Sequence, residues 1–169
     1  MITLVLGGTR SGKSEVAETL LGAVGPVTYV ATGRVTDPDM GRRIDAHRAR
    51  RPASWTTVEA GADLVAALDR SGDPVLVDSL GTWVAAHPDL APDAAALVAA
   101  LRARAARAAG PTVIVSEEVG MGVHPPTEVG RRFADAVGAL NREVAAVADR
   151  VLLVVAGRVL PLDRAVPEA

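Results

Sequence analysis

The first residues with a chemical pattern are eight near the N-terminus: Gly7, Gly8, Thr9, Arg10, Ser11, Gly12, Lys13 and Ser14. Glycines at the first and sixth positions let the backbone turn its N–H groups toward phosphate oxygens. The lysine at the seventh position binds the β- and γ-phosphates, and the serine hydroxyl at the eighth position binds Mg²⁺. The apolar run 2–6 before the motif predicts a buried strand, and residues 14–21 predict a helix whose N-terminus faces the anion. This is a complete Walker A pattern, and it predicts nucleoside triphosphate binding.

Lys13 is the only lysine in the chain, and every other cationic side chain is arginine. An ammonium is a compact point charge, whereas a guanidinium is a wide planar fork, so a single lysine is expected where a phosphate cradle has no room for the fork. The alternative is a glycine-rich turn formed by chance, but the four fixed positions of the motif rarely coincide in a chain of this length. We therefore predict that Lys13 is catalytic.

Asp78 ends the apolar run 74–78, which is the arrangement of a Walker B strand. A carboxylate at this position holds Mg²⁺ through water while the hydroxyl of Ser14 binds the metal directly. We therefore predict a Mg²⁺ site at Ser14 and Asp78, with the metal carried by the nucleotide. The alternative is that Asp78 caps the following turn, which is less consistent with the Walker A motif upstream.

A third group of chemical residues is a cluster of arginines around one histidine: Arg42, Arg43, His47, Arg48, Arg50 and Arg51. In a helix, Arg43 is four residues before His47, and Arg50 and Arg51 are three and four after it, so these side chains share a face. Neighbouring guanidiniums repel one another unless an anion joins them, and a triphosphate would serve. From these residues alone, a solvated basic helix face is at least as good an explanation.

The elements that must position these residues follow from hydrophobic periodicity and from turn residues. Strands are expected at residues 2–6, 27–31, 55–58, 74–78, 112–116 and 151–155, with an edge strand at 159–162 that contains Pro161. Helices are expected at residues 14–21, 62–68 and 94–109, from Asp37 or Asp39 to about residue 51, and over a long segment whose apolar side chains recur from Val129 to Val147. Arg102, Arg104 and Arg107 are expected to form a solvated face of helix 94–109.

This alternation predicts one α/β domain over residues 1–169, with a mostly parallel twisted sheet, helices on both faces and an antiparallel hairpin at its C-terminal edge. Ligands of such sheets bind beyond the carboxyl ends of the strands. Polar residues recur there, after successive strands: the phosphate loop, Thr32, Asp78, Ser116 to Glu118, and the turn at Gly157. The topology therefore predicts the place of the binding site.

Composition excludes several classes of protein. The net charge of −2 argues against a surface that coats nucleic acid, and the absence of cysteine excludes disulfides, thiolate metal sites and thiol nucleophiles. We find no secretory signal and no apolar run long enough to cross a membrane. A cytoplasmic protein is expected, without membrane insertion and without a nucleic-acid partner.

Several segments together resemble the bifunctional adenosylcobinamide kinase/adenosylcobinamide-phosphate guanylyltransferase family of cobalamin assembly. They are the Walker A loop, the run 29–32, Arg43-Ile44 followed by His47, Arg51-Pro52, residues 55–59, the loop 119–122 and the late residues Arg131, Phe133, Asp135, Gly138, Leu140 and Asn141. The phosphate loop is shared by many folds, whereas the His47 segment and the Val-Gly-Met-Gly loop are specific. The similarity extends over nearly the whole chain.

The resemblance implies a RecA-like P-loop fold, usually trimeric. It also implies an enzyme that phosphorylates adenosylcobinamide and then transfers GMP from GTP to that phosphate. The substrates would be a corrinoid with GTP and ATP, the cofactor Mg²⁺, and His47 the catalytic residue that carries GMP covalently. The nucleotide contacts it implies are Gly7, Gly8, Thr9, Arg10, Ser11, Gly12, Lys13, Ser14, Ala31, Thr32, Gly33, Arg48, Ala49, Arg50, Arg51, Glu59 and Asp78.

Three positions depart from the family pattern: Glu117 replaces the usual Asn, Ala134 the usual Arg and Arg142 the usual Gln. They lie outside the nucleotide motifs, so we expect them to affect the corrinoid-facing side of the site rather than the GTP chemistry.

Three other functions are weighed against this one. A RecA-like ATPase acting on nucleic acid would need more basic and aromatic side chains than this chain has. A kinase of small metabolites without nucleotidyl transfer would not need His47. A regulatory GTPase is the least consistent, because no Asn-Lys-x-Asp guanine-recognition motif is present.

Overall fold

Strand β1 (Ile2–Gly7), which leads into the phosphate loop, lies inside a sheet between β5 (Thr112–Glu117) and β6 (Arg150–Val155). The computed structural model describes residues 1–33, 41, 48–107 and 110–164. Within these residues the sheet has seven strands in the order β3-β2-β4-β5-β1-β6-β7. The remaining strands are β2 (Thr28–Ala31), β3 (Thr56–Glu59), β4 (Val75–Asp78) and β7 (Arg158–Leu162). All neighbours are parallel except β6 and β7, which confirms the predicted sheet and its C-terminal hairpin.

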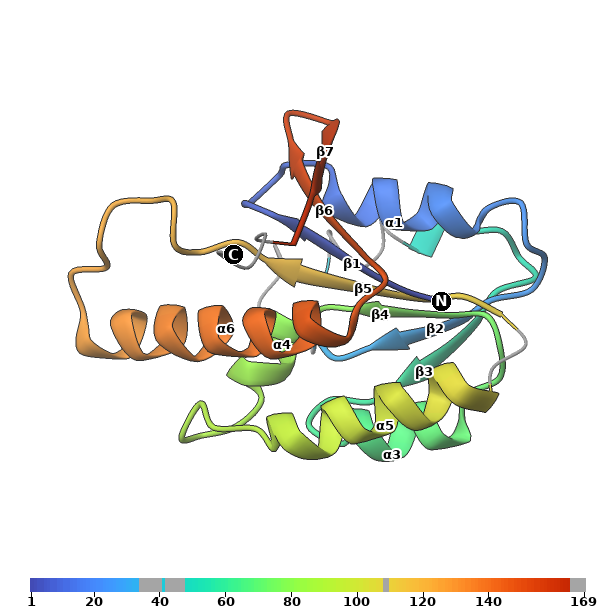
Figure 1. The fold of residues 1–169 in the computed structure, drawn as a ribbon, viewed down its shortest axis with the longest axis horizontal. Helices are drawn as coiled ribbons and strands as arrows, with labels where there is room; N and C mark the ends of the chain where they lie inside the picture. The colour runs from blue at the N-terminus through green and yellow to red at the C-terminus, as the bar shows by residue number, and fades with distance from the viewer. Residues whose placement is uncertain (34–40, 42–47, 108–109, 165–169) are drawn as a thin grey trace, which may run out of the picture.

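Helices cover both faces of the sheet, as predicted (Figure 1). Helix α1 (Lys13–Leu21) packs on one face, and the other face carries α3 (Leu64–Arg70), α4 (Leu80–Ala85), α5 (Ala94–Arg107) and α6 (Glu128–Val147). No helix among the described residues is long and apolar enough to span a membrane.

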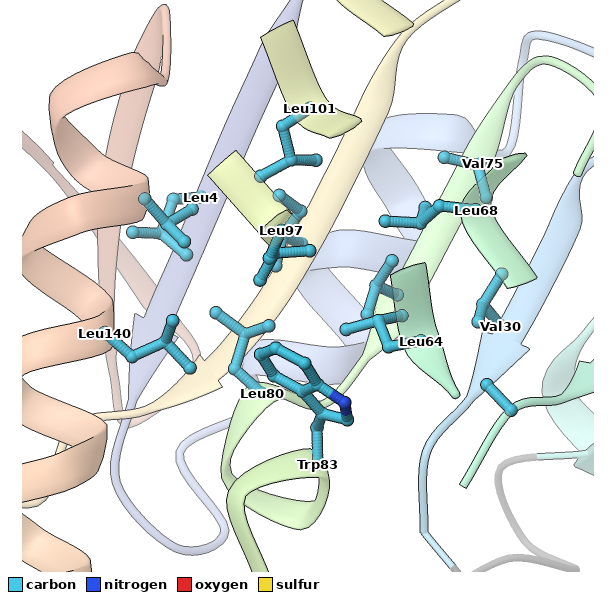
Figure 2. Close-up of a cluster of buried hydrophobic side chains, with 14 of the residues drawn as sticks. Leu4, Val30, Leu64, Leu68, Val75, Leu80, Trp83, Leu97, Leu101 and Leu140 are labelled. Carbon is cyan, nitrogen blue, oxygen red and sulfur yellow. The ribbon is translucent and has the colours of Figure 1, made fainter. Parts of the chain in front are cut away.

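Each interior strand is apolar on both sides, because successive side chains point to opposite faces and both faces are covered. In β4, Val75 and Val77 join the cluster under α3 to α6, whereas Leu76 joins the cluster under α1. The larger cluster centres on Trp83, Leu80, Leu97 and neighbouring leucines (Figure 2). These interior strands carry the polar residues of the site at their carboxyl ends.

Where the structure describes them, the predicted boundaries agree to within two residues, but helix α4 was not predicted. The start of the helix predicted from Asp37 or Asp39 lies outside the described residues. Ser79 forms its N-cap: the side chain accepts a hydrogen bond from the backbone N–H of Thr82, and the Thr82 hydroxyl pairs back with the Ser79 backbone. This capping box makes a helix begin immediately after the Walker B strand. The spacing of Leu80, Trp83 and Val84 by three and four residues is that of a helix. The segment is short and apolar, however, so its helical periodicity is weak.

The prediction that Arg104 lies on a solvated face of helix 94–109 is wrong. Arg102 and Arg107 are exposed, but Arg104 is only 2% exposed. Its guanidinium donates to the carbonyl oxygens of Leu68 at 3.0 Å, Ser71 at 3.1 Å and Gly72 at 2.5 Å, and it pairs with Asp73. Burial lowers the pKa of Arg104, and the Asp73 charge opposes that change. The residue lies on the buried stripe of α5, seven residues after Leu97 and three after Leu101, and it caps the C-terminus of α3.

Replacing Arg104 with Met should lower the free energy of unfolding by about 3 kcal/mol, because Asp73 and several carbonyl oxygens would lose their partner while the apolar stem is kept. Urea unfolding followed by circular dichroism measures this. The matched control is Arg102→Met on the exposed face of the same helix, which should change stability by less than about 0.5 kcal/mol. Equal effects of the two substitutions would show that the buried contacts of Arg104 do not stabilise the fold.

Candidate active site

The phosphate loop connects β1 to α1 and begins the helix without a side-chain cap, so the first N–H groups of α1 stay available to an anion. Gly12 is the N-cap residue and has a φ of 92°, a backbone conformation that L-residues with a side chain rarely adopt. The turn after β6 supports the loop, because the N–H of Gly157 donates to the carbonyl oxygen of Ser11 at 2.8 Å. The Lys13 ammonium folds back over the loop and donates to the carbonyl oxygen of Gly8 at 3.3 Å.

A cavity of about 470 Å³ opens from this loop across the carboxyl ends of β2, β3, β4 and β5. It is lined by Thr9, Arg10, Ser11, Gly12, Lys13, Ser14, Glu15, Tyr29, Ala31, Gly33, Arg48, Arg50, Arg51, Thr57, Glu59, Asp78, Ser79, Thr82 and Glu117. Most of the predicted nucleotide contacts are in this set. Four predicted contacts, Gly7, Gly8, Thr32 and Ala49, do not line the cavity.

Thr32 lies behind the cavity wall and is 1% exposed. Its hydroxyl donates to the carbonyl oxygen of Ser79 at 2.6 Å, and it accepts from the Ser79 N–H at 2.9 Å. The side chain therefore joins the end of β2 to the start of α4.

Glu117 is the carboxylate next to the phosphate-loop lysine, with 3.8 Å between its Oε1 and the Lys13 Nζ. The Ser79 hydroxyl donates to Oε1 at 2.8 Å, and the N–H of Gly81 donates to Oε2 at 2.9 Å. A Cβ at position 81 would collide with this carboxylate, so the contact requires glycine. The backbone carbonyl oxygen of Glu117 accepts from the Asn141 amide of α6 at 2.9 Å.

This position corrects the expectation that the departure at Glu117 leaves the nucleotide chemistry untouched. Register pairs Gly7, where the phosphate loop starts, with Glu117 on the neighbouring strand. A motif-based division of the chain misses such a contact because 110 residues separate the two strand ends (117 minus 7). The feature of the sequence that could have indicated this contact is the position of Glu117 at the carboxyl end of an apolar strand.

Asp78 lies at the end of β4, and its Oδ2 accepts a hydrogen bond from the hydroxyl of Tyr29 at 2.9 Å. Burial raises the pKa of Tyr29, and the negative charge of Asp78 raises it further, so the phenol stays protonated and remains a donor. Sequence reasoning placed Tyr29 in a strand but not in the site. The sequence did carry a signal for this position. Tyr29 is two residues before Ala31, a predicted nucleotide contact, and in a strand two such side chains point to the same face of the sheet.

The arginine segment is held against the face of β2 and β3 beside α1. Residues 48–50 are helical. Arg48 lies 3.7 Å from Glu59, Arg50 lies 3.2 Å from Glu18, and the guanidinium of Arg51 lies 3.7 Å from the centre of the Tyr29 ring. The cavity therefore has one cationic wall besides the phosphate loop. Arg42, Arg43 and the predicted nucleophile His47 lie outside the described residues.

The oxygen ligands of the cavity suit a magnesium ion carried by a nucleotide. Ser14 and Asp78 both line it, and hydroxyl and carboxylate oxygens are the ligands that Mg²⁺ prefers. In the part of the chain that the structure describes, no three His, Cys, Asp or Glu side chains gather as a metal site. A Mg²⁺ ion here would therefore complete its coordination with phosphate oxygens and water.

Replacing Glu117 with Gln should strengthen nucleoside triphosphate binding about 5-fold, because a carboxylate that competes for Lys13 and repels the phosphates is removed. Calorimetric titration with GTP and with ATP measures the dissociation constants. Glu118→Gln is the matched control, since Glu118 bonds to the N–H groups of Gly120 and Met121 and does not line the cavity. Weaker binding in Glu117→Gln would instead mean that the carboxylate supports the bound phosphates.

Known proteins match this chain along almost its full length. It is 41% identical over 169 residues to the bifunctional adenosylcobalamin biosynthesis protein CobP of Pseudomonas aeruginosa, covering 96% of this chain and 97% of that protein. It is 37% identical over 175 residues to the bifunctional adenosylcobalamin biosynthesis protein CobU of Escherichia coli, covering 93% of this chain and 97% of that protein.

Among solved structures, a prototypical ATPase from the type III secretion system of pathogenic bacteria superposes with a TM-score of 0.55 at 17% identity. The match covers 90% of this chain and 50% of that one, and it supports the P-loop fold alone. The family model described as cobinamide kinase / cobinamide phosphate guanyltransferase matches residues 3–162. With the two relatives, this match confirms the resemblance drawn from the sequence: the chain belongs to the cobinamide kinase / cobinamide phosphate guanyltransferase family, a family of transferases.

Proposed function

We propose that the protein phosphorylates adenosylcobinamide with a nucleoside triphosphate and then transfers GMP from GTP to the product, giving adenosylcobinamide-GDP through a guanylylated His47. One domain, residues 1–169, carries both reactions. The observation that supports this most directly is that the phosphate loop and Arg48, the residue that follows His47 in the chain, line the same cavity. Both reactions would use it.

In the kinase reaction, the aminopropanol hydroxyl of the corrinoid attacks the γ-phosphorus. An O–P bond forms, the bond from the γ-phosphorus to the bridging oxygen breaks, a nucleoside diphosphate leaves and the hydroxyl proton passes to water. Lys13 neutralises the β- and γ-phosphates as charge moves onto the leaving group. Ser14 and Asp78 would hold Mg²⁺, which when bound supplies further neutralisation of the phosphate oxygens.

In the transferase reaction, an imidazole nitrogen of His47 attacks the α-phosphorus of GTP and pyrophosphate leaves. The phosphate of adenosylcobinamide phosphate then attacks the same phosphorus, and the N–P bond breaks. A neutral imidazole is a competent nucleophile near neutral pH, since its ordinary pKa is about 6.5. Arg48, Arg50 and Arg51 would stabilise the pyrophosphate charge. Arg48 and Arg50 would exchange their present carboxylate partners for phosphate oxygens, whereas Arg51 would stay on the Tyr29 ring.

The other proposed nucleotide contacts are the loop 7–14, residues 31–33, the segment 48–51, Glu59 and Asp78. All of these except Gly7, Gly8, Thr32 and Ala49 line the cavity. The family resemblance supports a homotrimer acting in the cytoplasm. Sedimentation of the purified protein tests the trimer.

Replacing Lys13 with Arg should lower kcat/KM for the triphosphate at least about 100-fold, because the wider guanidinium does not fit the cradle that the ammonium occupies. Steady-state phosphorylation of adenosylcobinamide measures it. Arg102→Lys, an exchange in the opposite direction on the exposed face of α5, is the control and should behave as wild type. Near-wild-type turnover in the Lys13 variant would contradict the phosphate-cradle role of this residue.

The His47 intermediate is tested by intact-mass measurement after incubation with GTP and Mg²⁺. Wild type should gain the mass of one GMP and His47→Ala should gain none. The adduct should survive alkali and be lost in acid, because protonation of the phosphoramidate nitrogen makes the imidazole a good leaving group. The Ala variant should lose GMP transfer but keep part of its kinase activity, since Lys13, Ser14 and Asp78 still handle the γ-phosphate.

The controls are His87→Ala and His124→Ala, which should form the adduct like wild type. An adduct on either of these histidines, or GMP transfer at the wild-type rate by His47→Ala, would overturn the proposed mechanism. A kinase that phosphorylates the corrinoid but never forms the adduct would be a metabolite kinase without nucleotidyl transfer.

A further inference from the structure

Tyr29 is the only tyrosine of the chain, and its side chain contacts both walls of the cavity. Its hydroxyl donates to Asp78 Oδ2 at 2.9 Å, on the metal side. The face of its ring lies 3.7 Å from the guanidinium of Arg51, on the arginine side. The residue is 6% exposed, so little of it is left for solvent.

The strand register explains why one side chain reaches both groups. Ala31 of β2 pairs with Asp78 of β4, and Tyr29 pairs with Thr57 of β3. Tyr29 and Ala31 point to the same face, so the long phenol extends along that face to the strand end where Asp78 lies. Arg51 covers the ring from outside and also donates to the hydroxyl of Thr57 at 3.3 Å.

Apolar packing alone does not account for a tyrosine at this position. The ring packs with Val27, Leu76 and Ala17 in the cluster under α1, where a phenylalanine would fill the same space. A buried hydroxyl destabilises a core unless it is hydrogen-bonded, and here it is bonded to a charged acceptor. The hydroxyl and the face turned to Arg51 therefore point to a role in the site.

We propose that Tyr29 is a positioning residue: it fixes the Asp78 carboxylate at the metal side of the cavity and Arg51 at the triphosphate side, so that one rigid side chain sets the distance between the two. This rests on the proposed function in one respect, the use of Asp78 toward a nucleotide-bound metal.

The physical reason is rotational freedom. The terminal torsion of an aspartate is broad, so each hydrogen bond to the carboxylate narrows the range of orientations that it samples. Hydrogen bonds from the surroundings of a metal site orient its ligands, and losing one weakens metal binding about 10- to 100-fold. Arg51 carries a long side chain, and the ring beneath it restricts its rotamers, while the N–H groups point outward from the edge of the guanidinium plane.

The test uses Mn²⁺ as the probe and a non-hydrolysable GTP analogue, with metal binding followed by electron paramagnetic resonance. Tyr29→Phe keeps the ring and removes the hydroxyl, and it should weaken Mn²⁺ binding about 10-fold. Thr28→Val is the matched control: it removes a hydroxyl from the adjacent residue of the same strand, which points to the opposite face, and should leave the affinity unchanged.

A double-mutant cycle shows whether Tyr29 acts through Asp78. In an Asp78→Ala background, Tyr29→Phe should have no further effect on Mn²⁺ affinity, because the oriented group is gone. Tyr29→Leu also removes the ring under Arg51, so it should weaken binding of the metal-free analogue about 5-fold relative to Tyr29→Phe.

The proposal is wrong if Tyr29→Phe binds Mn²⁺ like wild type, or if its effect adds fully to that of Asp78→Ala. If the Phe variant does not fold, the wild-type protein labelled with ¹³C-tyrosine provides the second measurement, since its one ring signal should broaden when Mn²⁺ and the analogue bind together. No broadening would overturn the proposal. These readouts need neither corrinoid nor His47, so failure of the proposed reactions would leave them intact.

Discussion

The parallel pairing of β1 between β5 and β6 is the constraint on which the rest of the site depends. It places the phosphate loop between Glu117 at the end of β5 and the Gly157 turn at the end of β6. Because both neighbours run in the same direction as β1, their carboxyl ends meet at one edge, where loop backbone is free to meet a ligand. The apolar sequences of these strands are what keep that pairing buried.

Three cations that line the cavity already have carboxylate partners. Lys13 lies beside Glu117, Arg48 beside Glu59 and Arg50 beside Glu18. A triphosphate must replace some of these contacts, so its affinity is the difference between new and old ion pairs and not the full strength of the new ones. The exposed Arg48–Glu59 pair exchanges at little cost in free energy. The Lys13–Glu117 contact is more enclosed, so it has more influence on the affinity.

In the proposed function, two reactions on different phosphorus atoms of a triphosphate would take place in one cavity. The phosphate loop and Asp78 line one side of the cavity, the arginine segment lines the other, and β2 lies between them. Tyr29 spans this interval with a ring that has few rotatable bonds, which is why an aromatic residue suits the position better than a long flexible one. In a chain with few aromatic residues, Tyr29 is both part of the buried apolar cluster and bonded to a residue of the site.

The sequence by itself determined the alternation of strands and helices, the phosphate loop with Lys13 and Ser14, the Walker B carboxylate Asp78 and the family of the protein. These follow from local patterns: apolar runs, glycine spacing and short motifs that act through neighbouring backbone. Only the tertiary structure decided the partners of Arg104, Tyr29 and Glu117, which respectively cap α3, hold Asp78 and lie against Lys13. In each case the partner is distant in sequence and is brought near by strand register and helix packing, which no local pattern encodes. The same side chain is solvated or buried, inert or part of a site, according to what the fold places against it.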